Sequence, residues 1–252
     1  MLIELIGCSN AGKTTLAGKV LQECQEQGID MILAEDFVLQ QLRLNGIKDE
    51  RTRKAFVNGA GMVASLAAWR TLGPAVVFST RLLRPLPVSS WERVGLLRNV
   101  MKRLGVSQIV RDRRGEKQIV LYDEGPLHNA HNLFVHLSSE PQLDAIHRFV
   151  RLTPLPDLVV YVKEAEPVLI ERIIKRGHRR IADLSAENVA RFVRRATATF
   201  DELVQDPAVQ RRLMVVAAGQ QAALPRGAAS NAAMGDALDV LCGLASHALG
   251  VA

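Results

Sequence analysis

The chain has 252 residues, of which 48% are hydrophobic and 23% charged, and its formal net charge is +6 at pH 7. This length predicts one large domain or a domain with insertions, so residues 1–252 are treated as a single domain. No run approaches the ~18 uncharged apolar residues that a membrane-spanning helix needs, and the amino terminus leads directly into an apolar strand, so neither a membrane segment nor a signal peptide is expected.

The first predicted elements surround a phosphate-binding loop. An apolar strand at residues 2–6 precedes a segment that fits G-x-x-x-x-G-K-[ST], and a helix is expected over residues 13–27. The glycines allow a tight turn with inward amides, and the helix start adds its positive dipole end. Lys13 is expected to reach the β- and γ-phosphates of ATP, and the Thr14 hydroxyl to bind Mg²⁺. The residues expected to bind the nucleotide are Gly7, Asn10, Ala11, Gly12, Lys13, Thr14 and Thr15. The alternative is a glycine turn with an incidental lysine.

Strands and helices then alternate, which predicts a three-layer α/β sandwich with a mostly parallel central sheet. The expected strands are residues 31–34, 75–79, 118–122, 158–162 and 213–217. The expected helices are residues 62–72, 127–153, 167–176, 186–204, 233–249 and a helix that is capped by Ser89 or Ser90 and runs to 104. Residues 111–117 are interpreted as a basic turn, and residues 220–232 as a surface loop.

Asp123 and Glu124 follow the expected strand at residues 118–122. Ligands of parallel sheets gather beyond the carboxyl ends of the strands, so an acid here can hold the Mg²⁺ that Thr14 also binds. Asp123 is the favoured metal ligand, and a helix-capping acid is the alternative. Glu124 is a second metal candidate, a base or a substrate-orienting group, with a solvated turn carboxylate as the alternative.

Glu35 and Asp36 close the strand expected at residues 31–34. Phosphoryl transfer to an alcohol benefits from a carboxylate that accepts the hydroxyl proton, so either acid is a candidate base. The alternative is an acidic helix start.

Arg176, Arg179 and Arg180 lie with His178 between two expected helices. Arginine forks neutralise the charge of a transferring phosphoryl group, so residues 176–185 are predicted to form a lid that closes over ATP. A helix end carrying favourable positive charge is the alternative.

The remaining charged and metal-ligating residues are assigned weaker roles. The basic stretch that contains Lys102 and Arg103 and continues to Lys117 is interpreted as solvated surface, and Arg81 and Arg84 as weak candidates for an anionic acceptor. Three histidines, at positions 128, 131 and 136, are interpreted as a polar helix face. The three cysteines have neither disulfide-framework nor metal spacing, which suits a reducing cytoplasm.

Together these features resemble the P-loop nucleoside and nucleotide kinases, thymidylate kinase in particular. Such proteins follow a Pro-Asp pair with a strand, then a helix carrying Glu-Arg, then Arg-Gly at the lid. The chain has Pro156-Asp157 before its strand, Glu171-Arg172 in the helix, and Arg176-Gly177 after it. The resemblance implies a P-loop NTPase fold of the nucleotide-kinase type, with the acceptor-binding region at residues 40–118.

The acceptor motifs of that family are absent. Thymidylate kinases follow the Walker-B-like strand with Asp-Arg-Tyr or Asp-Arg-Phe, whereas this chain has Asp123-Glu124-Gly125. The deoxynucleoside-kinase motif Glu-Arg-Ser is not matched either, and Glu35-Asp36-Phe37-Val38 only loosely resembles their Glu-Pro-Val. A second carboxylate stands where an acceptor phosphate would be bound, so a neutral or weakly anionic acceptor is expected.

The sequence therefore predicts an ATP- and Mg²⁺-dependent kinase of a small molecule, with a nucleoside or nucleotide as the leading acceptor. A kinase of a sugar or another alcohol is the first alternative, and a nucleotide-dependent switch is the second, although no Asn-Lys-x-Asp motif occurs. Aromatic residues are only 4% and do not alternate with basic ones, so nucleic acid is not an expected partner. A homodimer is left open.

Overall fold

The computed structural model describes residues 1–116, 118–181, 183–217 and 243. A parallel sheet occupies the centre, with the strand order β2-β3-β1-β4-β5. Its strands are β1 (Leu2–Ile6), β2 (Met31–Leu33), β3 (Ile119–Tyr122), β4 (Leu158–Lys163) and β5 (Leu213–Ala217). Strands β1 and β3 are buried along their whole length, because helices cover both faces of a parallel sheet.

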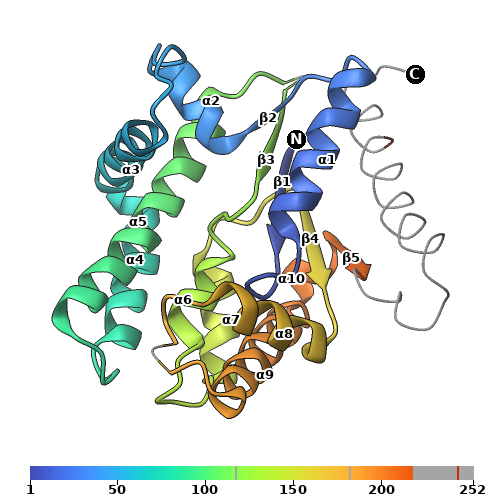
Figure 1. Cartoon of the computed structure of the whole chain (residues 1–252). Coiled ribbons are helices and arrows are strands. Elements are labelled where there is room, and N and C mark those ends of the chain that lie inside the picture. Colours follow the sequence, from blue (N-terminus) through green and yellow to red (C-terminus); the bar gives the residue numbers. More distant parts are fainter. Residues whose placement is uncertain (117, 182, 218–242, 244–252) are drawn as a thin grey trace, which may run out of the picture.

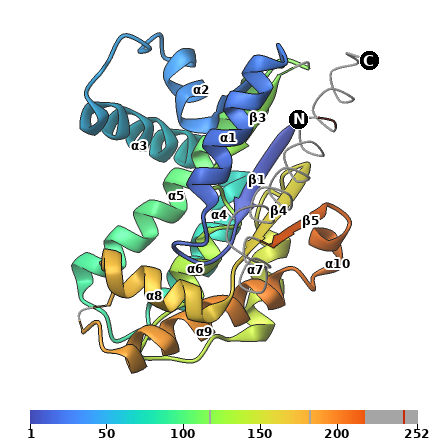
Figure 2. The same cartoon turned by 45° about the vertical axis from the view of Figure 1, so that its right-hand side comes forward.

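Helices flank the sheet and extend from one side of it (Figure 1). They are α1 (Lys13–Glu26), α2 (Ala34–Gln41), α3 (Glu50–Ala67), α4 (Trp69–Leu83), α5 (Ser90–Arg113), α6 (Asn129–Phe134), α7 (Leu143–Leu152), α8 (Glu166–Arg176), α9 (Ala186–Leu203) and α10 (Pro207–Gln210). In Figures 1 and 2, α3 and α5 lie side by side on the outer side of the molecule, while α8 and α9 lie near the phosphate-binding end of β1. The predicted three-layer α/β fold is confirmed.

The three hydrophobic clusters of the core meet at β1. Ile3 and Leu5 pack with α1, α8 and α9, and Ile6 packs with α4 to α7 and the end of α9. Leu2 joins the cluster formed by α2, α3 and α5. Asp157 fixes this strand in place, because its Oδ2 accepts the Leu2 amide at 2.7 Å.

Two predicted elements are wrong in the region between β2 and β3. Residues 75–79 lie inside α4 rather than in a strand. The buried residues of α4 include Leu72, Ala75, Val76, Ser79 and Leu83, a spacing of three and four residues typical of a helix face. Short apolar runs do not distinguish the two structures by composition. The helix expected over residues 62–72 is divided, with its first part at the end of α3 and its last part in α4.

Other boundaries also differ from the expectation. Helix α5 begins after the Ser89 cap, as predicted, but continues to Arg113 and absorbs part of the expected basic turn. Residues 127–153 form two helices, because the chain turns between α6 and α7. Arg180 donates to the Val135 carbonyl and Arg195 to the His136 carbonyl in that turn, which replaces helical hydrogen bonds. The expected loop at 220–232 and helix at 233–249 fall outside the described residues, apart from residue 243.

In the described residues, no helix taken singly has both the length and the apolar composition to cross a bilayer. Helices α3 and α4 reach the threshold only when joined, and they are bent by 107° where they meet.

Candidate active site

The phosphate loop lies between β1 and α1, and its backbone conformation requires glycine at two positions. Gly7 has φ of 139°, and a Cβ there would lie 2.5 Å from the Val162 carbonyl oxygen. Gly12 has φ of 98°, in a region that favours glycine. Asn10 also has positive φ, at 65°, which asparagine tolerates better than most residues. The loop backbone is therefore shaped by its own sequence.

Lys13 is buried at the first turn of α1. Its Nζ donates to the carbonyls of Gly7 at 3.1 Å and Cys8 at 2.9 Å. Burial lowers the pKa of Lys13, although the carboxylates of Glu124 and Asp123 act in the opposite direction. The ammonium is held inside the loop that would surround a phosphate.

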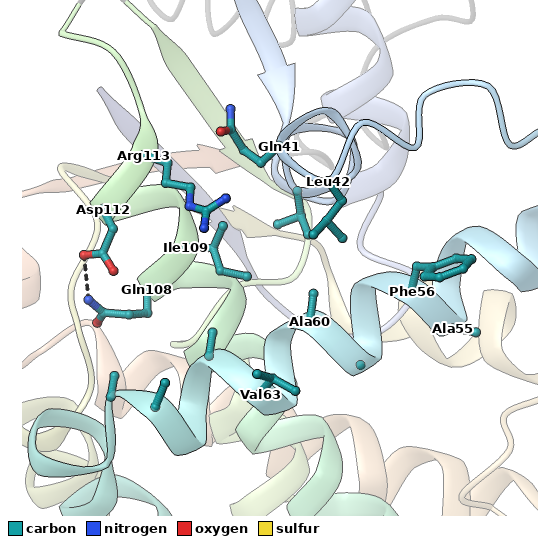
Figure 3. A pocket seen from close by; sticks show the side chains of 15 residues that line it. Gln41, Leu42, Ala55, Phe56, Ala60, Val63, Gln108, Ile109, Asp112 and Arg113 are labelled. Atoms are coloured by element: carbon teal, nitrogen blue, oxygen red, sulfur yellow. Dashed lines mark hydrogen bonds between the residues drawn. The ribbon is translucent and has the colours of Figure 1, made fainter.

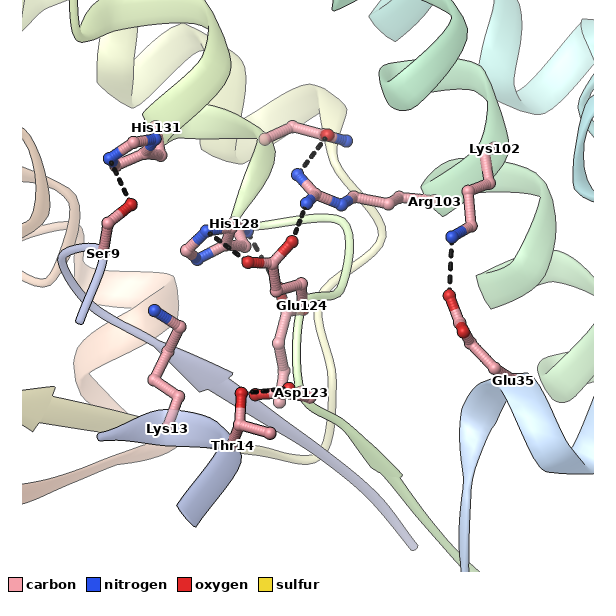
Figure 4. A network of polar contacts seen from close by, with 12 residues as sticks. Ser9, Lys13, Thr14, Glu35, Lys102, Arg103, Asp123, Glu124, His128 and His131 are labelled. Carbon is pink, nitrogen blue, oxygen red and sulfur yellow. Dashed lines mark hydrogen bonds and ion pairs between the residues drawn. The ribbon is translucent and has the colours of Figure 1, made fainter. Parts of the chain in front are cut away.

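Asp123 lies at the carboxyl end of β3, beside Thr14 of the phosphate loop (Figure 4). The Thr14 Oγ1 donates to Asp123 Oδ2 at 2.7 Å, whereas Asp123 Oδ1 is buried without a hydrogen-bond partner in the described part of the chain. Burial raises the pKa of Asp123, and the Thr14 hydrogen bond partly offsets that effect. A hydroxyl and a buried carboxylate oxygen without a partner fit a hard divalent cation such as Mg²⁺. No cluster of three or more His, Cys, Asp or Glu metal ligands occurs in the described residues, so phosphates and water would supply the other ligands.

Glu124 has two side-chain partners, the guanidinium of Arg103 and the neutral imidazole of His128. Arg103 of α5 donates to its Oε2, and His128 Nε2 lies 3.5 Å from its Oε1. Burial alone would raise the pKa of Glu124, but the charges of Arg103 and Lys13 outweigh it and the pKa is lowered. Arg103 also donates to Asn129 Oδ1 at 3.1 Å, so this guanidinium is fixed between the carboxylate and α6.

The interpretation of Lys102 and Arg103 as solvated surface is wrong. The side chain of Arg103 is only 12% exposed, and Lys102 Nζ donates to Glu35 Oε1 at 2.5 Å. Both side chains point from α5 towards the acids at the ends of β2 and β3 (Figure 4). Basic residues on a helix resemble solvated surface in the sequence, because the sequence does not show which face of the helix lies beside the sheet.

Glu35 and Asp36 lie in the first turn of α2, because β2 ends at Leu33. Glu35 pairs with Lys102, and Asp36 pairs with Arg53 of α3. The acids therefore belong to a helix start that nevertheless faces the carboxyl end of β3.

These residues line a cavity of about 400 Å³, hereafter the cleft. It brings together the two acids of α2, the two acids after β3 and the cations of α5 and α3. The charged residues that line it are Glu35, Asp36, Lys54, Lys102, Arg103, Asp123 and Glu124. Arg81 and Arg84 are not among the lining residues, and Arg114 pairs with Asp157 before β4, at the opposite end of the sheet.

The arginines of the expected lid differ in their surroundings. Arg176 and Arg179 are exposed. Arg180 reaches inward, donating to the carbonyls of His131 at 3.1 Å and of Val135. Burial lowers the pKa of Arg180 to about 10.

The three histidines expected on a polar helix face are buried instead. His128 and His131 stack with ring centroids 5.6 Å apart, and burial lowers the pKa of both well below the usual value. Ser9 of the phosphate loop lies 3.4 Å from His131 Nε2 and 3.3 Å from His178 Nε2. The neutral imidazoles thus connect the loop to α6 and to the segment after α8.

Two further residues of the site were not singled out from the sequence. Arg172 of α8 donates to the Asn10 carbonyl at 3.1 Å and pairs with Glu164, also at 3.1 Å. The sequence signal that could have indicated a role for Arg172 in the site is the Glu171-Arg172 pair of the family resemblance. Glu4 of β1 lies under Gly125, where a Cβ would come within 2.5 Å of the Glu4 Cδ. Burial raises the pKa of Glu4 to about 8, and the His128 amide, which donates to Oε1 at 2.9 Å, partly offsets this.

A larger cavity of about 730 Å³ lies elsewhere, in a groove between α2, α3 and α5 (Figure 3). Its walls are mainly Ala, Val and Leu with Phe56, and its polar residues include Gln108, which donates to Asp112 at 2.8 Å. None of the phosphate-loop residues or the acids after β3 lines it. The volume of a cavity alone therefore does not identify the candidate active site.

No known protein family matches the chain by sequence, and no curated protein does. Solved structures match it in fold. Deoxyadenosine kinase from M. mycoides with products dCMP and a flexible dCDP bound has 14% identity and a TM-score of 0.50, covering 96% of this chain and 100% of that one. The same enzyme with dATP gives 14% and 0.47, covering 96% and 99%, and with dCTP 13% and 0.43, covering 96% and 100%. The first of these likenesses shows that the chain has the fold of a P-loop nucleoside kinase.

Proposed function

We propose that this protein transfers a phosphoryl group from ATP, with Mg²⁺, to a hydroxyl group of a small molecule, a nucleoside or nucleotide being the leading acceptor. The observation that carries the proposal is the hydrogen bond between Thr14 of the phosphate loop, next to buried Lys13, and Asp123, which lines the cleft. The fold shared with a deoxyadenosine kinase supports it.

In this proposal the phosphate-loop amides and Lys13 bind the phosphates. Thr14 and Asp123 hold Mg²⁺, which when bound neutralises phosphate charge. Arg172 acts through the Asn10 carbonyl and fixes the loop. Arg176 at the end of α8 and Arg179 in the segment after it are proposed to stabilise the transferring group, while Arg180 holds that segment on α6.

Glu35 is the proposed base. Both carboxylate oxygens of Glu124 have a partner, Arg103 or His128. Lys102 donates to Glu35 Oε1, and the Oε2 of Glu35 makes no hydrogen bond with the described residues that line the cleft or surround it. Asp36 is the alternative, because its pairing with Arg53 also leaves one oxygen without a hydrogen bond to the described residues. Glu35→Gln is expected to lower kcat by ~10²-fold or more with little effect on the KM for ATP.

A sugar or another polyhydroxylated alcohol is the second candidate acceptor. Among the described residues that line the cleft, Tyr122 is the only aromatic one, and it is nearly buried. Paired charges such as Glu35–Lys102 instead present hydrogen-bonding groups. This composition favours hydroxyl recognition over stacking of a nucleobase.

The test is acceptor-dependent ADP formation over nucleosides, nucleotides, sugars and sugar phosphates, with Lys13→Ala as the comparison. Loss of one preorganised charge of this kind typically lowers the rate ~10²-fold or more. Multiple turnover that needs an added acceptor separates a kinase from a nucleotide switch. Near-normal turnover by a folded Lys13→Ala variant would end the kinase proposal.

A further inference from the structure

A second cavity is lined in part by α5, and among its lining residues only Arg179 and Arg180 have a role in the proposed chemistry. Its volume is about 520 Å³, and it is formed by the first half of α5, by α6 and by the segment between α8 and α9. The polar and aromatic residues that line it are Trp91, Glu92, Arg98, Asn99, Asn132, Arg179 and Arg180. We call it the distal cavity.

The distal cavity and the cleft are lined by successive turns of α5. Asn99 in the distal cavity precedes Arg103 in the cleft by one helical turn, which is roughly 6 Å along the axis. On α6, Asn132 of the distal cavity follows Asn129 by three residues, and Asn129 accepts a hydrogen bond from Arg103. The two cavities are therefore about one helical turn apart on α5, a separation that a small molecule with two polar ends can span.

The two cavities differ in how their cations are paired. In the cleft, Lys54, Lys102 and Arg103 each pair with a glutamate. In the distal cavity, Arg98 and Arg179 make no ion pair or hydrogen bond with the described residues. Glu92 is the one carboxylate among the lining residues, and it forms no ion pair with them.

A buried donor adds to this excess of positive charge. The Asn132 Nδ2 is buried without an acceptor in the described part of the chain. Two guanidinium forks and an amide donor in one cavity are complementary to a phosphate group, which accepts several hydrogen bonds and carries the opposite charge. Trp91, which is 86% exposed, stands in the wall of the same cavity.

We propose that the distal cavity binds a phosphate group that the acceptor already carries, remote from the hydroxyl that reacts in the cleft. The proposal rests on the proposed kinase function and specifies its substrate class as a phosphorylated alcohol. It replaces the expectation of a neutral or weakly anionic acceptor, and it assigns Arg179 to this phosphate rather than to the transferring group. That expectation rested on Glu124 being an uncompensated carboxylate, whereas Arg103 compensates it.

Trp91 provides a direct readout of the distal cavity. The chain contains two tryptophans, so a Trp69→Phe variant leaves Trp91 as the only one. Titration of this variant with inorganic phosphate and pyrophosphate should change its fluorescence saturably. Arg98→Gln and Arg179→Gln, each in this background, should weaken that binding by about tenfold or more, the typical effect of losing a charge-assisted hydrogen bond. Arg70→Gln removes an exposed arginine outside both cavities and should leave it unchanged.

Lys13→Ala in the same background separates this site from the phosphate loop. The Trp91 response should survive Lys13→Ala, although binding of Mg²⁺-ATP, measured by calorimetry, should be lost. A response that disappears with Lys13→Ala and persists in Arg98→Gln would place the anion in the loop and overturn the proposal. Absence of saturable phosphate binding by both fluorescence and calorimetry would overturn it too.

Turnover distinguishes the failure of this proposal from the failure of the proposed function. Each alcohol in the acceptor screen is paired with a derivative phosphorylated at another position. We expect ADP formation only with the phosphorylated members. Equal turnover of the unphosphorylated members would preserve the kinase and refute the distal phosphate site, whereas no acceptor-dependent turnover would count against the kinase itself.

Discussion

At the residue scale, Lys13 and Asp123 differ in how far their hydrogen-bonding groups are paired within the protein. The Lys13 ammonium is bonded to two carbonyls of its own loop, so the loop is held in shape from within. Asp123 has one oxygen bonded to Thr14 and one buried oxygen that finds no partner among the described residues. A buried carboxylate oxygen without a partner destabilises the fold, which is typical of a group kept for a ligand.

Asp123→Asn is expected to raise the Mg²⁺ concentration needed for half-maximal turnover by at least tenfold, because it removes the anionic ligand and keeps the side-chain volume. ATP binding without metal should change little. A Mg²⁺ titration at saturating ATP measures this, with Asp36→Asn as the matched control in the same cleft. An unchanged Mg²⁺ requirement would move the metal role to Glu124.

Glu4→Gln is expected to change how stability depends on pH. The pKa of Glu4 is raised to about 8 in the folded protein, so between about pH 4.5 and 8 the unfolded chain is ionised while the folded one is protonated. Stability is therefore greatest below the unfolded pKa and falls as pH rises towards 8, by up to about 1.4 kcal/mol per pH unit. The Glu4→Gln variant has no ionisable group at this position, so its stability does not fall with pH for this reason.

Urea unfolding from pH 6.5 to 8 compares the two proteins. The window begins at 6.5 because the histidines 128 and 131, whose pKa values are lowered, contribute the opposite slope below it. The difference in unfolding free energy between variant and wild type should grow with pH. A constant difference would show that Glu4 is already ionised in the fold.

At the element scale, α3 and α5 position the cations of the cleft. They cross at two glycines, because a Cβ at Gly105 would lie 1.7 Å from the Gly61 carbonyl oxygen. This close approach allows Lys54 of α3 and Lys102 of α5 to line the same cavity. The small residues are thus required by the site as well as by the packing.

Gly105→Ala is expected to destabilise the protein by about 3 kcal/mol or more, because the methyl group would overlap backbone atoms of Gly61 and Ser65 in the facing helix. Gly59→Ala is the control. It lies in α3, a Cβ there meets nothing within 4 Å, and alanine should stabilise the helix by about 0.5–1 kcal/mol. Thermal melting of both variants measures the contrast, and similar melting temperatures would contradict the crossing described here.

On the scale of the whole molecule, β1 is shared by all three core clusters. Leu2, Ile3 and Ile6 each face a different cluster, so none of the three can be separated without losing part of the central strand. This supports our proposal that residues 1–252 form one domain rather than a core with an independent acceptor region.

Unfolding is therefore expected to be a single cooperative transition. Trp69 in α4 and Trp91 in α5 report on residues 40–118, whereas far-ultraviolet circular dichroism reports on all helices. The two signals should give the same urea midpoint. A tryptophan transition that precedes the loss of helical signal would show that α2 to α5 unfold on their own.

The sequence alone determined those elements that form because of residues within the same short segment. The phosphate loop follows from glycines that need positive φ, and all five strands of the described residues lie in mostly apolar runs, as the sheet of an α/β fold requires. The strand expected at 31–34 ended one residue early, and Glu35 still reached the cleft from a helix start. The roles assigned to these residues remain predictions.

Only the tertiary structure decided which distant side chains complete the cleft. Arg103 and Lys102 stand 21 and 67 residues from the glutamates that they contact, and no local pattern distinguishes them from solvated helix residues. Residues 75–79 formed a helix, because the packing of α4 against α5 and α7 outweighs the β-propensity of a short apolar run. The acceptor charge that we propose also depends on the tertiary structure. It depends on which arginines are left without a carboxylate, and that becomes fixed only when the helices have packed.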